Sequence, residues 1–446
     1  MGGLLLKNGN VLDYFPSDLA GAPRPLVERV DLRIDGERVV ERGPGLEARP
    51  GDEVIDLGGR TVMPGNVNAH GHLYASLAAG MPAPKAPLST FTDILTEIWW
   101  PLDRALDAEA VYLSALAGAW GAVRCGTTLI FDHHASLSSV GGSLDRIEQG
   151  LTEVGLRGCL CYEVTDRGGK GQRDITLEEN ERYLQKLRDK PVGADVPRFR
   201  GLVGAHASFT LEDRTLQLLE GICSRQGAGL HIHLAEGTTD REVSRDRGWR
   251  DPLQRLVDNG LVRPGSIFAH GVDLSPLDMQ VIEEAGAWLV HCGRSNMNNG
   301  VGRAPVDRFP ARSGVGTDGL DDNMWGELRT TFFRGNEGGR GPLGHAGAAR
   351  LWLGNYRLAR DIFGEPFGSL ETGAPADFII LNNFQKTPLT TDTWLSHLLF
   401  DFHPWDIDAV YVGGARVYAA GMKPPVESSR LQAAAAKLWR AMGWQS

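Results

Sequence analysis

Short apolar runs separated by turns mark both ends of the chain. Near the N-terminus they lie at 3–6, 30–34, 38–40 and 53–55, and near the C-terminus at 377–381 and 409–418. Turn dipeptides such as Asp35-Gly36 and Gly58-Gly59 punctuate them, and Gly413-Gly414 predicts a hairpin. We expect the two ends to pair with each other in one small β-domain.

The middle of the chain alternates apolar strand-like segments with helical ones. The strands are expected at 61–70, 127–134, 155–164, 202–209, 229–236, 266–272, 288–292 and 314–319, and helices near 107–123, 143–155, 177–188 and 211–226. Eight βα units predict an α/β fold, a closed parallel (β/α)8 barrel. The expected domains are residues 1–60 and 367–446, which form a composite β-sandwich with a C-terminal helix, and residues 61–366, which form the barrel.

The composition of the chain disfavours several classes of protein. The 446 residues are 42% hydrophobic and 23% charged, which supports a large core, and the net charge of −10 disfavours a nucleic-acid partner. The apolar run at the N-terminus has three residues, fewer than the ~7 of a signal-peptide core, and no run elsewhere reaches the ~18 residues of a membrane span, so no membrane partner is expected. Five cysteines without CxxC spacing read as free thiols of a cytoplasmic protein. Glycine, at 57 residues, is nearly twice as frequent as the usual ~7%.

Histidines carry the candidate chemistry. Eight of the 12 fall at or just after the predicted strand ends: His70, His72, His133, His134, His206, His233, His270 and His291. The carboxyl ends of barrel strands share one face, where active sites lie. His70 and His72 point the same way on a strand and can reach one ion. With His233 on a later strand and Asp318 ending the last, they form a donor set suited to a catalytic divalent metal.

Several segments match a known family. VMPGNVNAHGH resembles the first-strand signature of the amidohydrolase superfamily, and HLAE, FAHGV, SNMNNGVG and VGTDG resemble its cytosine-deaminase-like branch. DHHAS, GAHASFT, RSNMNN and IWWPLD are most similar to the SsnA-type aminohydrolases and chlorohydrolases. The resemblance covers essentially the whole chain, and it implies a hydrolase with a barrel and a β-sandwich, assembled as a homodimer or homotetramer.

The resemblance also assigns the metal ligands. It implies that His70, His72, His233 and Asp318 hold one divalent metal ion, Zn²⁺ or alternatively Fe²⁺. His231 shares a strand face with His233 but lies about 6–7 Å deeper, so we give it a structural role. The chain departs from the common HTH and HNPRSN motifs at Gly71 and at Cys292-Gly293.

The expected mechanism follows from these groups. A divalent ion lowers the pKa of its water from about 16 towards 7, which makes hydroxide available at neutral pH. Asp318 accepts the proton of that water, Glu236 protonates a ring nitrogen as general acid, and His270 holds the attacking oxygen. The partners are therefore water and a small-molecule heterocyclic substrate, whose amino group leaves as ammonia.

Other uses of the barrel stay open. A binuclear site bridged by a carboxylated lysine is disfavoured, because the nearest lysine, Lys170, lies in the loop beyond the segment 155–164 that we number as the fourth strand. The same mononuclear site could expel sulfide or chloride or open a cyclic amide. An inactive scaffold is disfavoured because every ligand and proton-transfer residue is present.

Substrate contacts are expected in the loops that cover the barrel mouth. The long insertion after the first strand offers Trp99 and Trp100, with Met81 and Phe91, as walls for a flat ring. The remaining candidates are His206, which matches a substrate-contacting position of related deaminases, Arg167, which could bind a carboxylate or carbonyl through two nitrogens, His134 and Asn296.

Overall fold

A computed structural model describes residues 3–16, 25–84, 87–190, 195–338, 342–382 and 385–444. Within it, parallel strands form two sheets, β6 to β9 and β10 to β14. Isolated parallel bridges, Val164 to Ala205 and Gly71 to Asp318, join the sheets at both edges. The predicted (β/α)8 fold is confirmed. Its strands are β6 (Asn66–Gly71), β7 (Thr127–His134), β8 (Arg157–Tyr162), β9 (Phe199–Gly201) with β10 (Val203–Ala207), β11 (Leu230–Leu234), β12 (Ile267–His270), β13 (Trp288–His291) and β14 (Ser313–Val315).

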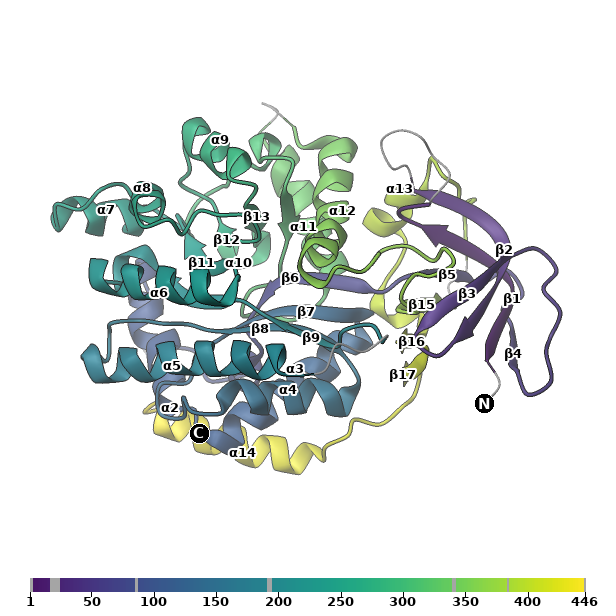
Figure 1. Cartoon of the computed structure of the whole chain (residues 1–446), viewed down its shortest axis with the longest axis horizontal. Coiled ribbons are helices and arrows are strands. Elements are labelled where there is room, and N and C mark those ends of the chain that lie inside the picture. Colours follow the sequence, from purple (N-terminus) through teal and green to yellow (C-terminus); the bar gives the residue numbers. More distant parts are fainter. Residues whose placement is uncertain are drawn as a thin grey trace.

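Helices follow the strands and surround the barrel (Figure 1). The four helices that the sequence pattern predicts are present, but α5 begins at Gly169 rather than near 177. Its first turns read GKGQRD, which has no apolar periodicity for a pattern to detect. The barrel helices are α3 (Ala108–Arg124), α4 (Ser143–Val154), α5 (Gly169–Arg188), α6 (Asp213–Gln226), α7 (Thr239–Asp246), α8 (Pro252–Asp258), α9 (Pro276–Glu284), α10 (Gly293–Asn298), α11 (Met324–Asn336) and α12 (Gly344–Phe363).

Two strand assignments from the sequence need correction. The predicted first barrel strand, 61–70, is divided, because Thr61–Pro64 (β5) pairs with strands of the terminal domain and only β6 enters the barrel. The segment 155–164 is the third barrel strand rather than the fourth. The fourth strand, β9 with β10, carries His206 and no lysine, so the argument against a lysine bridge holds at the corrected position.

The chain ends pair as predicted. They form one branched eight-stranded sheet in the order β17-β16-β15-β5-β1-β2-β3, with β4 also paired to β1, rather than two separate sheets. Gly413 and Gly414 connect the predicted hairpin with φ of 56° and 71°, where glycine is favoured. Besides β5, its strands are β1 (Leu4–Asp13), β2 (Leu26–Asp35), β3 (Arg38–Gly43), β4 (Glu53–Asp56), β15 (Phe378–Leu381), β16 (Ile407–Val412) and β17 (Ala415–Ala419).

A buried ion pair connects the terminal sheet to the barrel. Arg157, at the start of β8, is fully buried and its Nε and Nη2 contact the two carboxylate oxygens of Asp377 at 2.8 and 3.1 Å. Farther along the chain come α13 (Trp394–Phe400) and α14 (Ser428–Ala441), and α14 lies against the barrel helices far from the N-terminus (Figure 1). Trp439 of α14 donates from its indole to the Leu77 carbonyl at 2.8 Å.

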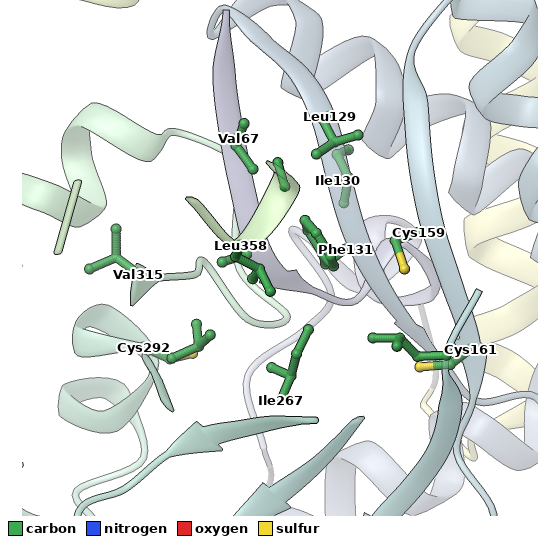
Figure 2. Packing of buried hydrophobic residues seen from close by; sticks show 14 of the residues in the cluster. Val67, Leu129, Ile130, Phe131, Cys159, Cys161, Ile267, Cys292, Val315 and Leu358 are labelled. Atoms are coloured by element: carbon green, nitrogen blue, oxygen red, sulfur yellow. The ribbon is translucent and has the colours of Figure 1, made fainter. Parts of the chain in front are cut away.

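The barrel strands pack one continuous apolar core. Figure 2 shows Val67 of β6 near Leu129 and Ile130 of β7, with Cys159 and Cys161 farther along on β8, and all five are at most 2% exposed. All five cysteines are free, as predicted, and four of them are buried. Burial raises the pKa of the Cys223 thiol to about 12, which makes it unreactive.

Candidate active site

A long connection after β6 covers the mouth of the barrel. It contains the 3-10 helix Leu73–Ala78, α1 (Phe91–Ile94), the π-helix Leu95–Trp99 and α2 (Trp100–Ala105). The hydroxyl of Thr90 accepts from the backbone N–H of Asp93 and the Asp93 side chain accepts in return, so this capping box starts α1. Beneath the connection lies a cavity. It is lined by His72, Tyr74, Phe91, Leu95, Trp99, Glu163, His206, His233, Glu236, Asn299, Asp318 and Gly319.

The four predicted metal ligands converge at the floor of this cavity. Nε2 of His72 lies 3.1 Å from Nε2 of His233 and 2.9 Å from Oδ1 of Asp318. Nε2 of His70 lies 3.2 Å from the same carboxylate oxygen. The ligand atoms of His70, His233 and Asp318 belong to one group within 4.8 Å of one another, and those of His70, His72 and His233 belong to another.

The hydrogen bonds of these rings show that a cation fits between them. Nδ1 of His72 contacts the His133 carbonyl, and Nδ1 of His233 lies 2.8 Å from the His206 carbonyl. A carbonyl only accepts, so both Nδ1 atoms are donors and each neutral ring points its Nε2 lone pair at the other. Two facing lone pairs repel unless a positive charge lies between them. Three imidazole nitrogens and a carboxylate are a donor set that zinc and iron both accept.

The pKa values agree that this position needs positive charge. Burial alone would lower the pKa of His72, but contact with Asp318 outweighs burial and raises it to about 9. Burial lowers the pKa of His70 to about 3, which keeps that ring neutral and able to ligate. A divalent ion therefore replaces a proton that the site otherwise attracts.

Backbone geometry brings Asp318 to the histidines. A Cβ on Gly316 would lie 2.6 Å from the His70 carbonyl oxygen, so only glycine lets the end of β14 approach β6 this closely. The Asp318 and His270 backbones have φ of 56° and 79°, a region that residues other than glycine rarely adopt. Strain of this kind gathers at functional sites.

One short helix holds the three predicted proton-transfer residues. Along α10 and its C-cap, Ser295 donates to Oδ2 of Asp318, Asn296 Oδ1 accepts from Nδ1 of His270 at 2.9 Å, and Asn299 donates to Oε1 of Glu236 at 3.2 Å. Asn296, which the sequence suggested as a substrate contact, is not among the residues lining the cavity. Its observed contact instead orients His270.

Glu236 has the environment of a general acid. It follows β11, 13% of its side chain is exposed, and its Oε2 lies 3.6 Å from Nε2 of His270. Burial raises the pKa of Glu236 to about 7, against the opposing effect of His270. A carboxyl with this pKa can both give and take a proton near neutrality.

Glu163 was not predicted from the sequence. This residue directly follows β8, is 2% exposed and lines the cavity, and its Oε1 lies 3.3 Å from Nδ1 of both His72 and His133. Burial alone would raise the pKa of Glu163, but His133 and His72 outweigh burial and lower it well below the usual range. The signal was a carboxylate at the end of an otherwise apolar strand.

The predicted aromatic and basic contacts divide into two sets. Trp99 and Phe91 line the cavity, as does His206, whose pKa burial lowers to about 3. Trp100 and Arg167 lie outside the lining, with the guanidinium 4.8 Å from the indole centroid. Arg167 contacts Asp103 through Nη2 and Thr165 through Nε. Of its three guanidinium nitrogens, only Nη1 has no hydrogen-bond partner among the described residues. Two-point binding of a substrate by Arg167 would first require release of these contacts.

The remaining predicted positions lie behind the site. His134 Nε2 contacts Ser136 Oγ at 2.8 Å, and neither His134 nor Met81 lines the cavity. His231 Nε2 contacts Nδ1 of His70 at 2.8 Å, which fixes the orientation of that ligand ring. At Gly71, the position that departs from HTH, a Cβ would lie 2.9 Å from Nδ2 of Asn68.

Comparison with known sequences identifies the family. The profile of the amidohydrolase family matches residues 61–417. The chain belongs to the amidohydrolase family. A relative named 5-methylthioadenosine/S-adenosylhomocysteine deaminase, from Desulforudis audaxviator, is 29% identical over 423 residues, which cover 92% of each chain.

Solved structures of the amidohydrolase fold resemble the whole molecule. An adenosine deaminase from Xanthomonas campestris with bound zinc superposes with a TM-score of 0.82 at 21% identity, covering 99% of this chain and 98% of that one. The atrazine chlorohydrolase TrzN from Arthrobacter aurescens superposes with a TM-score of 0.78 at 19% identity, covering 98% and 99%. At these identities the likeness establishes the fold.

This amidohydrolase therefore has a divalent metal site at the carboxyl ends of its barrel strands, as its family and its His/Asp cluster show. Among the described residues, no helix has the length and apolar character needed to cross a membrane.

Proposed function

We propose that this amidohydrolase deaminates a nitrogen heterocycle by hydrolysis, converting C–NH2 to C=O with release of ammonia. The observation that carries the proposal is Glu236, a carboxyl whose pKa burial raises to about 7 and which opens into the same cavity as the metal cluster. A poor leaving group such as an amine needs protons delivered to the ring and to the departing nitrogen, and a carboxyl of this pKa supplies them. The deaminase relative supports the same reaction class.

The metal would be held by His70, His72, His233 and Asp318, and we propose zinc, with iron(II) as the alternative. When bound, such an ion supplies positive charge at the cavity floor and lowers the pKa of the water that attacks. His231 and the carbonyls of His133 and His206 keep the three ligand rings oriented toward one point.

The protein side chains move the protons. Asp318, with one oxygen held by Ser295, accepts the proton of the attacking water. His270 donates from Nδ1 to Asn296, so Nε2 has a lone pair that accepts a hydrogen bond from that water. Glu236 gives its proton to the ring nitrogen beside the attacked carbon. As the tetrahedral carbon collapses to C=O, the proton on Asp318 passes to the leaving amine and the ring nitrogen keeps the proton that Glu236 gave it. Glu236 recovers a proton from the hydroxyl on the attacked carbon, so one water is consumed and one ammonia is released.

The aromatic wall and the compartment belong to the same proposal. Trp99 and Phe91 face the cavity and offer flat surfaces to a ring. The buried free thiols support a reducing compartment such as the cytoplasm. Assembly as a homodimer or homotetramer follows only from the family resemblance, and light scattering on the purified protein measures it.

The direct test compares wild type with Glu236→Gln. The variant should retain one equivalent of metal, measured by mass spectrometry, and lose roughly 10²-fold or more in ammonia release. Full ammonia release by the variant would refute the assigned role of Glu236. Rapid release of chloride or sulfide by that variant would instead support a hydrolase with a better leaving group.

A further inference from the structure

Glu163 and His206 form one wall of the cavity that the proposed chemistry does not use. They lie at the ends of the neighbouring strands β8 and β10, which the bridge from Val164 to Ala205 joins. Both side chains line the cavity, and the residues are only 2% and 7% exposed. A buried polar wall of this kind is costly unless its groups meet partners, so a ligand that satisfies it gains specificity.

The hydrogen bonds of Thr210 fix the tautomer of His206. The Thr210 hydroxyl donates to the Ala207 carbonyl at 3.0 Å, because a carbonyl only accepts. That hydroxyl oxygen therefore accepts from Nδ1–H of His206, at 2.9 Å. A neutral imidazole has one N–H, so Nε2 of His206 is left with a lone pair and acts as an acceptor.

Glu163 is the second acceptor of this wall. Its Oε1 lies 3.3 Å from the Nδ1 atoms of His72 and His133 but makes no hydrogen bond within the described part of the chain, so the carboxylate keeps an acceptor for a group in the cavity that it lines. The backbone N–H of Glu163 donates to the His134 carbonyl at 2.7 Å, so the backbone that carries this carboxylate is held in place. The ligand atoms of Glu163 and His206 lie within 4.8 Å of each other. The wall thus presents two neighbouring acceptors and no donor of its own.

A second metal ion does not explain this pair. With His233, Glu163 and His206 would make a three-ligand group. However, His233 commits Nδ1–H to the His206 carbonyl and points Nε2 at His72, where the first metal would be held. Two ligands would remain for a second ion, fewer than the three protein ligands of a catalytic site.

We propose that Glu163 and His206 bind a hydrogen-donor edge of the substrate ring. The inference rests on the proposed deamination and specifies its substrate class: an amino heterocycle that carries further ring N–H groups, as guanine or a pterin does. An adenine substituted at N9 has only acceptor nitrogens besides its reacting amine, and it would place them against acceptors. Because Glu163 contacts the metal ligand His72, the recognised edge belongs to the reacting ring rather than to a distant substituent.

The test uses zinc-loaded protein with guanine, 1-methylguanine and 9-methyladenine, each assayed for ammonia release and for binding by calorimetry. We expect wild type to favour guanine over 9-methyladenine by about 100-fold or more in kcat/KM. Glu163→Gln should lower kcat/KM for guanine roughly 10- to 100-fold while the protein keeps its metal. The matched control Glu220→Gln changes a carboxylate on the outer side of α6. It should leave kcat/KM for guanine, and the preference for guanine over 9-methyladenine, unchanged.

Thr210→Val provides an independent arm. Valine is nearly isosteric with threonine but cannot accept from Nδ1 of His206, so the ring becomes free to present Nε2–H to the cavity. We expect this variant to bind 9-methyladenine more tightly and guanine more weakly than wild type does. Thr152→Val, on the exposed face of α4, is the matched control and should bind both probes as wild type does.

Other outcomes would overturn the inference. Two equivalents of metal in wild type, falling to one in Glu163→Gln, would make Glu163 a ligand of a second ion. An equal loss for all three probes would make it a positioning residue for His72. Wild type could bind adenosine but not 2′,3′-dideoxyadenosine, while Glu163→Gln binds the two nucleosides equally. That result would show that the wall binds a ribose diol. Calorimetry could show tighter binding of guanine than of 9-methyladenine, reversed in Thr210→Val, although no probe releases ammonia. The proposed reaction would then be wrong, and the proposed binding of a hydrogen-donor edge would still be supported.

Discussion

The state of the Glu236 carboxyl predicts how activity depends on pH. Burial raises the pKa of Glu236 to about 7, and the reaction needs its protonated form. The protonated fraction then falls from about nine-tenths at pH 6 to about one-tenth at pH 8, so kcat/KM should fall about tenfold along the alkaline limb. Initial rates of ammonia release between pH 5.5 and 8.5, with metal content checked at each pH, measure this limb.

Removing the Asn299 side chain should shift the pKa of Glu236 in a known direction. The Asn299 side-chain amide donates to Glu236 at 3.2 Å and lowers the pKa of that carboxyl, because the bond favours the charged form. Asn299→Ala should therefore raise the pKa of Glu236 and move the alkaline limb to higher pH. Glu236→Gln should have low activity without this limb. A limb that stays at the same pH in Glu236→Gln would show that another group titrates, and would refute the role given to Glu236.

Further predictions concern the metal and the frame of the site. His72→Ala and Asp318→Asn should each lower bound metal to a few tenths of an equivalent or less and abolish turnover, and metal at wild-type levels would contradict the ligand assignment. Asp377→Asn removes the buried counter-ion of the Arg157 guanidinium and leaves only the partly exposed Glu37, at 3.5 Å, so urea unfolding should show a loss of stability near the lower end of about 3–5 kcal/mol. Gly316→Ala places a Cβ against the His70 carbonyl, so we expect a lower melting temperature together with weaker metal binding, and unchanged values for both would contradict the close approach.

The sequence predicted the parts of the site that depend on strand ends. Because His70, His72, His233 and Asp318 end parallel strands of one barrel, their order along the chain was enough to bring them together. The boundaries were less predictable. Thr61–Pro64 has the same apolar pattern as a barrel strand, and only its pairing with β1 and β15 shows that it belongs to the terminal sheet.

Contacts between side chains could not be predicted in the same way. Asn296 was a candidate substrate contact, but the short helix α10 turns it toward His270. Arg167 looked free to bind substrate, whereas Asp103 from the loop after β6 occupies it. Glu163 was overlooked since its partners, His72 and His133, come from two other strands. Such pairings depend on distances across the barrel that no local pattern contains.

The central claim is that one metal site and the carboxyl of Glu236 together expel ammonia from a heterocycle. The most direct measurement incubates metal-loaded protein with a panel of heterocyclic amines, thiohydantoins and chloro-heterocycles and quantifies ammonia, sulfide and chloride in the same samples. The account predicts ammonia in equal amount to a carbonyl product, dependent on the metal and on Glu236. Release of sulfide or chloride without ammonia, or ammonia release that persists after metal removal, would contradict it.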